Sequence, residues 1–121
     1  MIVPELKEIY SRDIFVGLHE YIPENKYFFE IDLILVIGVK GENGGDIFYL
    51  TVCSSSSISE VSKNCHFLSK DGYLIVDEYD FFNIKKIIED YLSTIAENNW
   101  EDVAKRINCF AKWEFDNYQN I

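Results

Sequence analysis

The chain has few cationic residues and no apolar run long enough to cross a bilayer. Eleven lysines and arginines stand against 21 aspartates and glutamates, so the 121 residues carry a formal net charge of -10. Such a balance repels nucleic-acid phosphate and anionic membranes and attracts basic partners. No stretch approaches the roughly 20 apolar residues of a membrane span, and no basic region with a following apolar run opens the chain. We therefore expect a cytoplasmic protein that binds neither nucleic acid directly nor membranes.

Cysteine and histidine are also scarce. Cys53, Cys65 and Cys109 are an odd number at unrelated spacings, which argues against a disulfide framework and fits a reducing compartment. Cys65 adjoins His66, but zinc sites usually pair ligands two to four residues apart in two sets. His66 and the other histidine, His19, fall in predicted loops, where structural or solvated imidazoles are favoured over a general base. The sequence thus predicts no metal site and no cofactor.

Motifs that carry catalysis are missing as well. The chain contains no G-x-S-x-G, no glycine-rich phosphate loop followed by lysine, and no H-E-x-x-H. Asp77, Glu78 and Asp80 lie close together in the sequence, and a site that uses two carboxylates for acid and base catalysis would need such a cluster. A strand-to-helix junction, however, also favours acids as caps and as partners of the helix dipole. We therefore predict no enzyme, and prefer a docking surface as the function of these acids.

What the chain does contain is enough apolar material for one core. Its residues are 48% hydrophobic and 16% aromatic, and its length is typical of one domain. We expect residues 1–121 to form a single domain that folds alone.

The strongest pattern is a hairpin of two strands. Every second residue of 27–39 is apolar, which puts one continuous stripe on one face of a strand. The opposite face begins with Glu30 and Asp32 and then becomes apolar, so this strand is expected to be central. Residues 46–53 form the partner strand. The turn between them draws its positive-φ positions from Gly41, Asn43, Gly44 and Gly45.

Further elements follow from local composition. Residues 3–10, with a proline near the start, predict a strand at or near the sheet edge. Residues 11–26 predict a loop, with room for a short irregular strand around 15–18. Residues 58–63 suggest one or two helical turns. The compact β-branched run at 73–76 predicts a fourth strand.

Two helices are predicted near the C-terminus. Asp80 resembles an N-cap, and apolar residues then recur at spacings of three and four over residues 81–97. Asn99, with Asp102 three residues on, resembles a capping box that opens a helix over 100–110. Strands first and helices last indicate an α+β domain. We expect an antiparallel sheet of about four strands with two C-terminal helices packed on one face.

The tail, residues 112–118, alternates aromatic and acidic side chains. It either caps the sheet or continues the helix. Trp113, Phe115 and Tyr118 are candidate interface anchors, although the core is the favoured place for such aromatics.

The order of several motifs resembles the immunity protein 8 family of bacterial polymorphic toxin systems. The motifs are FYLTVC at 48–53, LIVDEYD at 74–80, IKKIIE at 84–89 and WEF at 113–115. The resemblance extends from Glu5 to about Tyr118. It weakens at 54–57, where four serines replace the Thr-Pro and aromatic residue of related sequences.

The resemblance implies a small cytoplasmic protein, encoded beside a toxin, that binds the toxin domain and blocks its action without catalysis. The acidic charge fits a basic nuclease toxin. The candidate toxin-binding residues are Asp77, Glu78, Trp113, Glu114 and Asp116, with Glu30 and Asp32 on a competing strand face.

Two alternatives of other classes stay open at this point. One is a small acidic adaptor, which a neighbouring toxin gene would distinguish from an immunity protein. The other is a ligand-binding domain, or less plausibly an enzyme, that uses Cys53, Cys65 and His66.

Overall fold

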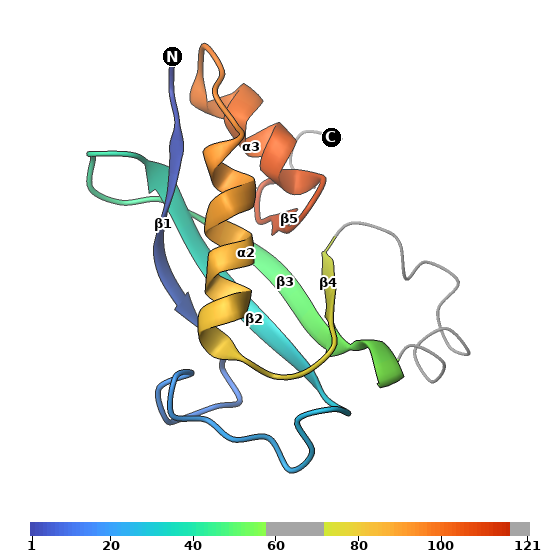
Figure 1. Cartoon of the computed structure of the whole chain (residues 1–121). Helices are drawn as coiled ribbons and strands as arrows, with labels where there is room; N and C mark the ends of the chain where they lie inside the picture. Colours follow the sequence, from blue (N-terminus) through green and yellow to red (C-terminus); the bar gives the residue numbers. More distant parts are fainter. Residues whose placement is uncertain (58–71, 117–121) are drawn as a thin grey trace.

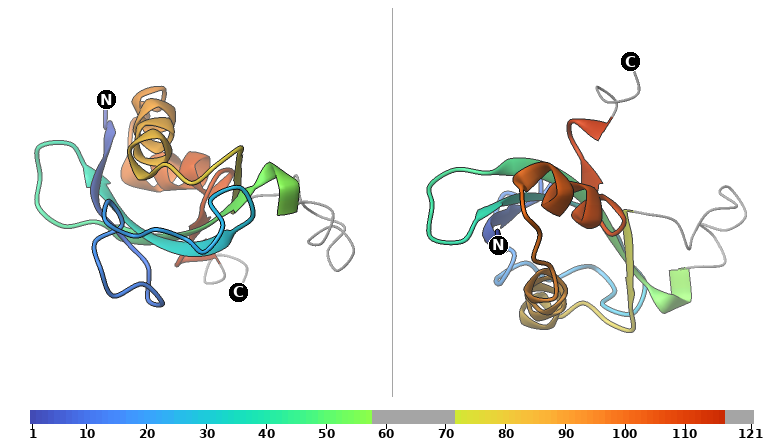
Figure 2. Two further views of the ribbon diagram at one scale, coloured as in Figure 1. Left: turned by 60° about the horizontal axis from the view of Figure 1, so that its bottom comes forward. Right: turned by 90° about the horizontal axis from the view of Figure 1, so that it is seen from above.

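The fold is one sheet with two helices on a single face, as the computed structural model shows for residues 1–57 and 72–116. The strands lie in the order β1-β2-β3-β4, and β5 adds to β3 (Figure 1). The elements in chain order are β1 (Pro4–Tyr10), β2 (Glu30–Val39), β3 (Asp46–Ser54), the short 3-10 helix η1 (Ser55–Ser57), β4 (Tyr73–Val76), α2 (Phe81–Ser93), α3 (Trp100–Asn108) and β5 (Lys112–Trp113). The predicted α+β class is confirmed, and Figure 2 shows both helices above the same side of the sheet.

The hairpin of β2 and β3 forms the centre of the sheet. Its strands pair antiparallel, with Leu33 opposite Leu50 and Leu35 opposite Phe48, and all four side chains are buried under the helices. The predicted apolar stripe is therefore the core face from Phe29 onward, whereas Tyr27, which the prediction included, precedes β2 and is 55% exposed. β2 has a neighbour on each side, as expected of a central strand.

The turn of this hairpin uses its glycines in two ways. Gly41 and Gly44 have φ of +85°, as predicted, whereas Asn43 and Gly45 do not have positive φ. A Cβ on Gly45 would lie 2.6 Å from the carbonyl oxygen of Ile37. Gly45 is thus required by the close approach of the two strands rather than by its own φ.

One strand runs in a direction that the sequence did not predict. β4 pairs parallel with β3, with Val52 opposite Leu74, so the sheet is mixed rather than wholly antiparallel. Residues 55–72 separate the two strands, which is the chain length that a parallel crossover needs. β1 lies at the other edge, antiparallel to β2, as expected. No strand forms at 15–18, and the helical turn suggested at 58–63 lies outside the described residues.

Both helices begin at the predicted caps. The Asp80 carboxylate accepts the N–H of Asn83 at 3.3 Å, and the Asn99 side chain accepts the N–H of Asp102 at 2.9 Å. α2 ends at Ser93, a turn earlier than predicted: the N–H groups of Thr94 and Ile95 donate to the carbonyls three residues back, Tyr91 and Leu92, instead of continuing the α-helical pattern. α3 ends at Asn108, two residues before the predicted end.

The tail caps the sheet, which was the first of the two alternatives. Trp113 of β5 pairs with Phe48 of β3, and its indole N–H donates to Asp46 Oδ2 at 3.0 Å. The indole N–H of Trp100, the first residue of α3, donates to the same oxygen at 2.8 Å. One carboxylate at the start of β3 therefore joins α3 and β5 to the hairpin.

This shared contact predicts a strong effect of replacing Asp46. Asp46→Ala removes the acceptor of two partly buried indole donors and should lower the free energy of unfolding by about 2–3 kcal/mol. Asp46→Asn keeps one acceptor oxygen and should cost about 1 kcal/mol or less. Urea unfolding followed by circular dichroism would measure both changes. The control is Asp90→Ala, because Asp90 lies on the exposed side of α2. Equal stability of Asp46→Ala and Asp90→Ala would contradict the role of this carboxylate.

Candidate functional site

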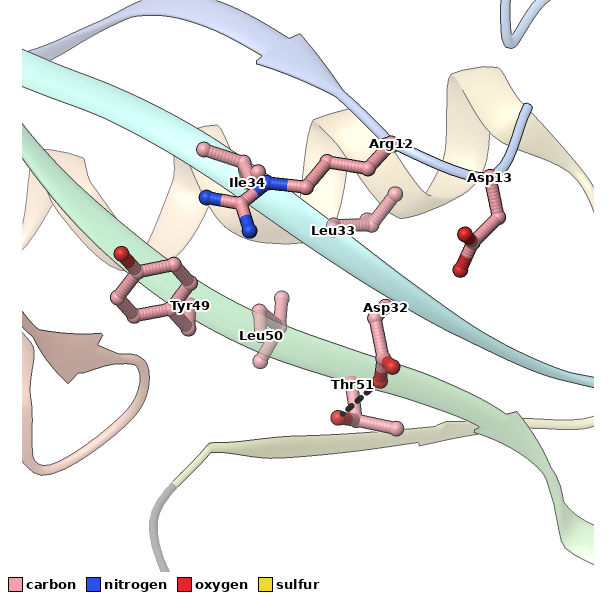
Figure 3. Close-up of a pocket in the computed structure, with 8 residues that line it drawn as sticks. All are labelled: Arg12, Asp13, Asp32, Leu33, Ile34, Tyr49, Leu50 and Thr51. Carbon is pink, nitrogen blue, oxygen red and sulfur yellow. Dashed lines mark hydrogen bonds between the residues drawn. The ribbon is translucent and has the colours of Figure 1, made fainter. Parts of the chain in front are cut away.

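The face of the sheet opposite the helices, here called the open sheet face, carries a shallow pocket of about 350 Å³. Strand register places Tyr10, Ile34 and Tyr49 side by side across it. Arg12, which follows β1, extends over β2 toward Ile34, and Ile34 is only 5% exposed (Figure 3). This explains why the second face of β2 is partly apolar. Asp32 lines the same pocket and accepts the hydroxyl of Thr51 at 2.8 Å.

Four of the acids predicted from sequence gather at one end of the sheet. Glu30 lies opposite Cys53 at the start of β2, and Cys53 lies beside Ile75 of β4. Asp77 follows β4 and accepts the hydroxyl of Ser55 at 3.2 Å. We call this group the acidic end. It consists of Glu30, Asp32, Asp77 and Glu78, and all four are exposed.

Glu78 connects the acidic end to the loop between β1 and β2. Its carboxylate lies 3.1 Å from Lys26 Nζ, and this contact raises the pKa of Lys26. Both groups are about half exposed, so the ion pair contributes little to stability. The ion pair places Lys26 beside Glu78 alone. The other three members of the acidic end have no ion pair among the described residues.

The other candidates lie elsewhere. Glu114 is at the opposite end of β3, where its backbone N–H donates to the carbonyl of Ile47 and its carboxylate accepts the Ile47 N–H. Asp116 is half-buried two residues further on. Trp113 is 8% exposed and stacks on Phe48 with 6.5 Å between ring centroids. The structure therefore supports the core alternative for Trp113, and places the tail acids away from the acidic end. Tyr118 lies outside the described residues.

A group of exposed apolar side chains was missed by the sequence interpretation. The loop between β1 and β2 leaves Phe15 97% and Ile22 85% exposed, together with Val16, Tyr27 and Phe28. The sequence did contain a signal for them: large apolar residues in this loop stand among turn residues and follow neither the spacing of a strand nor that of a helix. The sequence predicts only a loop for residues 11–26.

Tyr79 fixes this loop to the junction of β4 and α2. Its hydroxyl donates to the carbonyl of Leu18 at 2.8 Å, and its backbone N–H donates to that of Lys26 at 2.8 Å. Its ring meets Tyr21 and Phe29 edge-on, with centroids 5.4 and 5.5 Å away. Burial, with a smaller contribution from Tyr21, raises the pKa of Tyr79 to about 12. The loop is thus held to this junction at two points, the carbonyls of Leu18 and Lys26.

The cysteine and histidine alternative receives no geometric support from the residues that the structure describes. Cys53 is fully buried at the end of β3, so its thiol does not face solvent. Cys65 and His66 lie outside the described residues. His19 is exposed and lies 3.5 Å from Glu20. Within residues 1–57 and 72–116, no three His, Cys, Asp or Glu side chains are placed to hold a metal ion.

Comparison with known proteins decides the family. The model of the family described as Immunity protein 8 matches residues 4–118, nearly the whole chain. This chain belongs to the immunity protein 8 family. Membership implies an immunity protein whose partner is a toxin. Neither the curated proteins nor the solved structures contain a match to this immunity protein. Across its described residues, no helix has both the length and the apolar character for a membrane span.

The raised pKa of Tyr79 predicts how the stability of this immunity protein depends on pH. The folded state holds the phenol proton up to about pH 12, whereas an unfolded tyrosine loses it near pH 10. The contribution of the protonated Tyr79 side chain to the free energy of unfolding is therefore complete below pH 10 and is lost as pH rises from 10 through 12. Tyr79→Phe should cost about 1 kcal/mol at neutral pH through the lost hydrogen bond, and that deficit should shrink as pH rises.

Urea unfolding at a series of pH values would measure this difference. The control is Tyr49→Phe, because Tyr49 is 42% exposed on the open sheet face. Identical pH profiles for Tyr79→Phe and the wild type would show that Tyr79 does not titrate as the structure indicates.

Proposed function

We propose that this immunity protein neutralises its cognate toxin domain by binding it directly, and that the toxin surface it covers is basic, as in a nuclease. The proposal includes action in the cytoplasm of the producing cell and no catalytic step. The observation that carries it is the acidic end, where four exposed carboxylates lie within a chain of net charge -10.

The charges of the acidic end are poorly compensated. Only Glu78 has an ion pair among the four in the described part of the chain, with Lys26. Neighbouring carboxylates of this kind produce a negative potential that extends beyond contact distance and accelerates the approach of a basic protein. Glu30, Asp32 and Asp77 contribute most, because no described cation forms an ion pair with any of them.

The same charge explains how binding would inhibit. A nuclease must attract phosphate with lysine and arginine side chains. An acidic protein that binds those side chains competes with the nucleic acid for them. An interface of standard size, about 800 Å² on each partner, is enough to cover such a surface. Neutralisation then requires tight binding only, and no reacting group on the immunity protein.

The primary test is a titration against the toxin domain encoded beside this gene, at low and high salt, with toxicity scored in cells that express both. Tight binding with protection is expected, together with weaker binding at high salt because surface charges are screened. Binding without protection would favour the adaptor alternative. Absence of both binding and protection would refute the proposed function.

Charge reversal should locate the steering surface. Asp77→Lys with Glu78→Lys, and separately Glu30→Lys with Asp32→Lys, should each weaken binding about tenfold or more, mainly by slowing association. The dependence of affinity on salt should fall with the same changes. Association and dissociation rates measured at several salt concentrations would test this.

The control for these variants is Glu101→Lys on α3. Glu101 lies 3.5 Å from Lys105, so its reversal breaks a surface ion pair just as Glu78→Lys does. It changes the net charge without touching the acidic end. If the control weakened binding as much per charge as the test variants, total charge rather than the acidic end would be responsible.

A further inference from the structure

We propose that the toxin is anchored by the apolar side chains that the loop between β1 and β2 and the first turn of α2 hold outward, beside the acidic end. This inference rests on the proposed function and names the surface that performs it. We call this the loop-end surface. Its members are Phe15, Val16, Ile22, Tyr27, Phe28 and Phe82.

The exposure of these side chains is unusual for their size. Phe15, Ile22 and Phe82 are 97%, 85% and 68% exposed, whereas the largest aromatics of the open sheet face are about 40% exposed. Large apolar side chains exposed together on one surface mark an interaction site more often than scattered ones do. The loop-end surface therefore offers large apolar side chains that a partner could remove from water.

The fold positions the loop and yet keeps these side chains out of the core. Within the same loop, Leu18 and Pro23 are buried, and the N–H groups of Glu20 and Tyr21 both donate to the carbonyl of Gly17. Together with the Tyr79 hydroxyl on Leu18, these contacts fix the backbone from which the exposed side chains project. A preorganised loop loses little conformational entropy on binding, so its apolar contacts contribute more fully to affinity.

Charged groups lie beside at least part of the loop-end surface, as the rim of an interface requires. The first turn of α2 borders a hollow of about 340 Å³ that Lys26, Glu78, Asp80 and Phe82 line. The loop, the start of β2 and the beginning of α2 all lie at the same end of the molecule (Figures 1 and 2). An apolar centre with a charged rim is the usual anatomy of a protein interface.

The sign of that rim selects the occupant. Two copies of this chain, each of net charge -10, would bring their acidic ends together at this surface. A toxin domain that places apolar hollows between lysines and arginines meets both the aromatics and the acids. The open sheet face fits such a partner less well, because Arg12 lies over it without an ion pair among the described residues (Figure 3).

The test replaces anchors while leaving every charge in place. Phe15→Ser, Ile22→Ser and Phe82→Ser remove exposed side chains, so each variant should keep the wild-type urea midpoint. Each should weaken binding of the adjacent toxin domain about tenfold by faster dissociation, and the triple variant at least about a hundredfold, with loss of protection. The salt dependence of affinity should stay that of the wild type.

Tyr49→Ser, an exposed aromatic of the open sheet face, is the matched control and should bind normally. If the triple variant binds and protects like the wild type, the loop-end surface is not the anchor, although the proposed function stands. A loss confined to Tyr49→Ser would place the anchor on the open sheet face and overturn the inference. Failure of the wild type to bind would overturn the inference together with the proposed function.

Discussion

The pairing of β2 with β3 is the constraint on which the rest of the structure depends. It aligns the buried stripe of both strands, and α2 and α3 pack on that stripe. It also sets what lies at each end of the sheet. The turn end begins β3 with Asp46, which receives both indole donors. At the other end Glu30 of β2 lies opposite Cys53 of β3, and β3 is followed across the sheet by β4, which leads to Asp77. A shift of one residue would exchange the core face for the acidic one.

The sequence predicted the elements better than their arrangement. Alternation identified β2, and the side chains of Asp80 and Asn99 marked the helix starts, because a cap is a local interaction between near neighbours. The direction of β4 was missed, since a short β-branched run has the same composition in either direction. The end of α2 was misplaced because Ile95 continues the apolar spacing and is buried without being helical.

The candidate site was predicted only in part, for a related reason. Asp77 and Glu78 are neighbours in sequence, but their proximity to Glu30 depends on strand register across three strands, which a single sequence does not state. For Trp113 the sequence favoured the core but left the anchor role open, and its stacking on Phe48 supports the core. Of the exposed side chains of the loop, only Tyr27 belonged to a periodic pattern, that of the strand that follows, although together they distinguish this end of the molecule most clearly.

The placement of the two tryptophans has a practical consequence. Trp100 and Trp113 both contact Asp46, at the turn end of the sheet, and they are the only tryptophans of the chain. Their intrinsic fluorescence therefore reports on that end alone, far along β3 from the acidic end and the loop. Unfolding should change the emission strongly, while a ligand at the loop should leave it nearly unaltered. The chain thus carries an internal optical reporter of its folding that is separate from its binding surface.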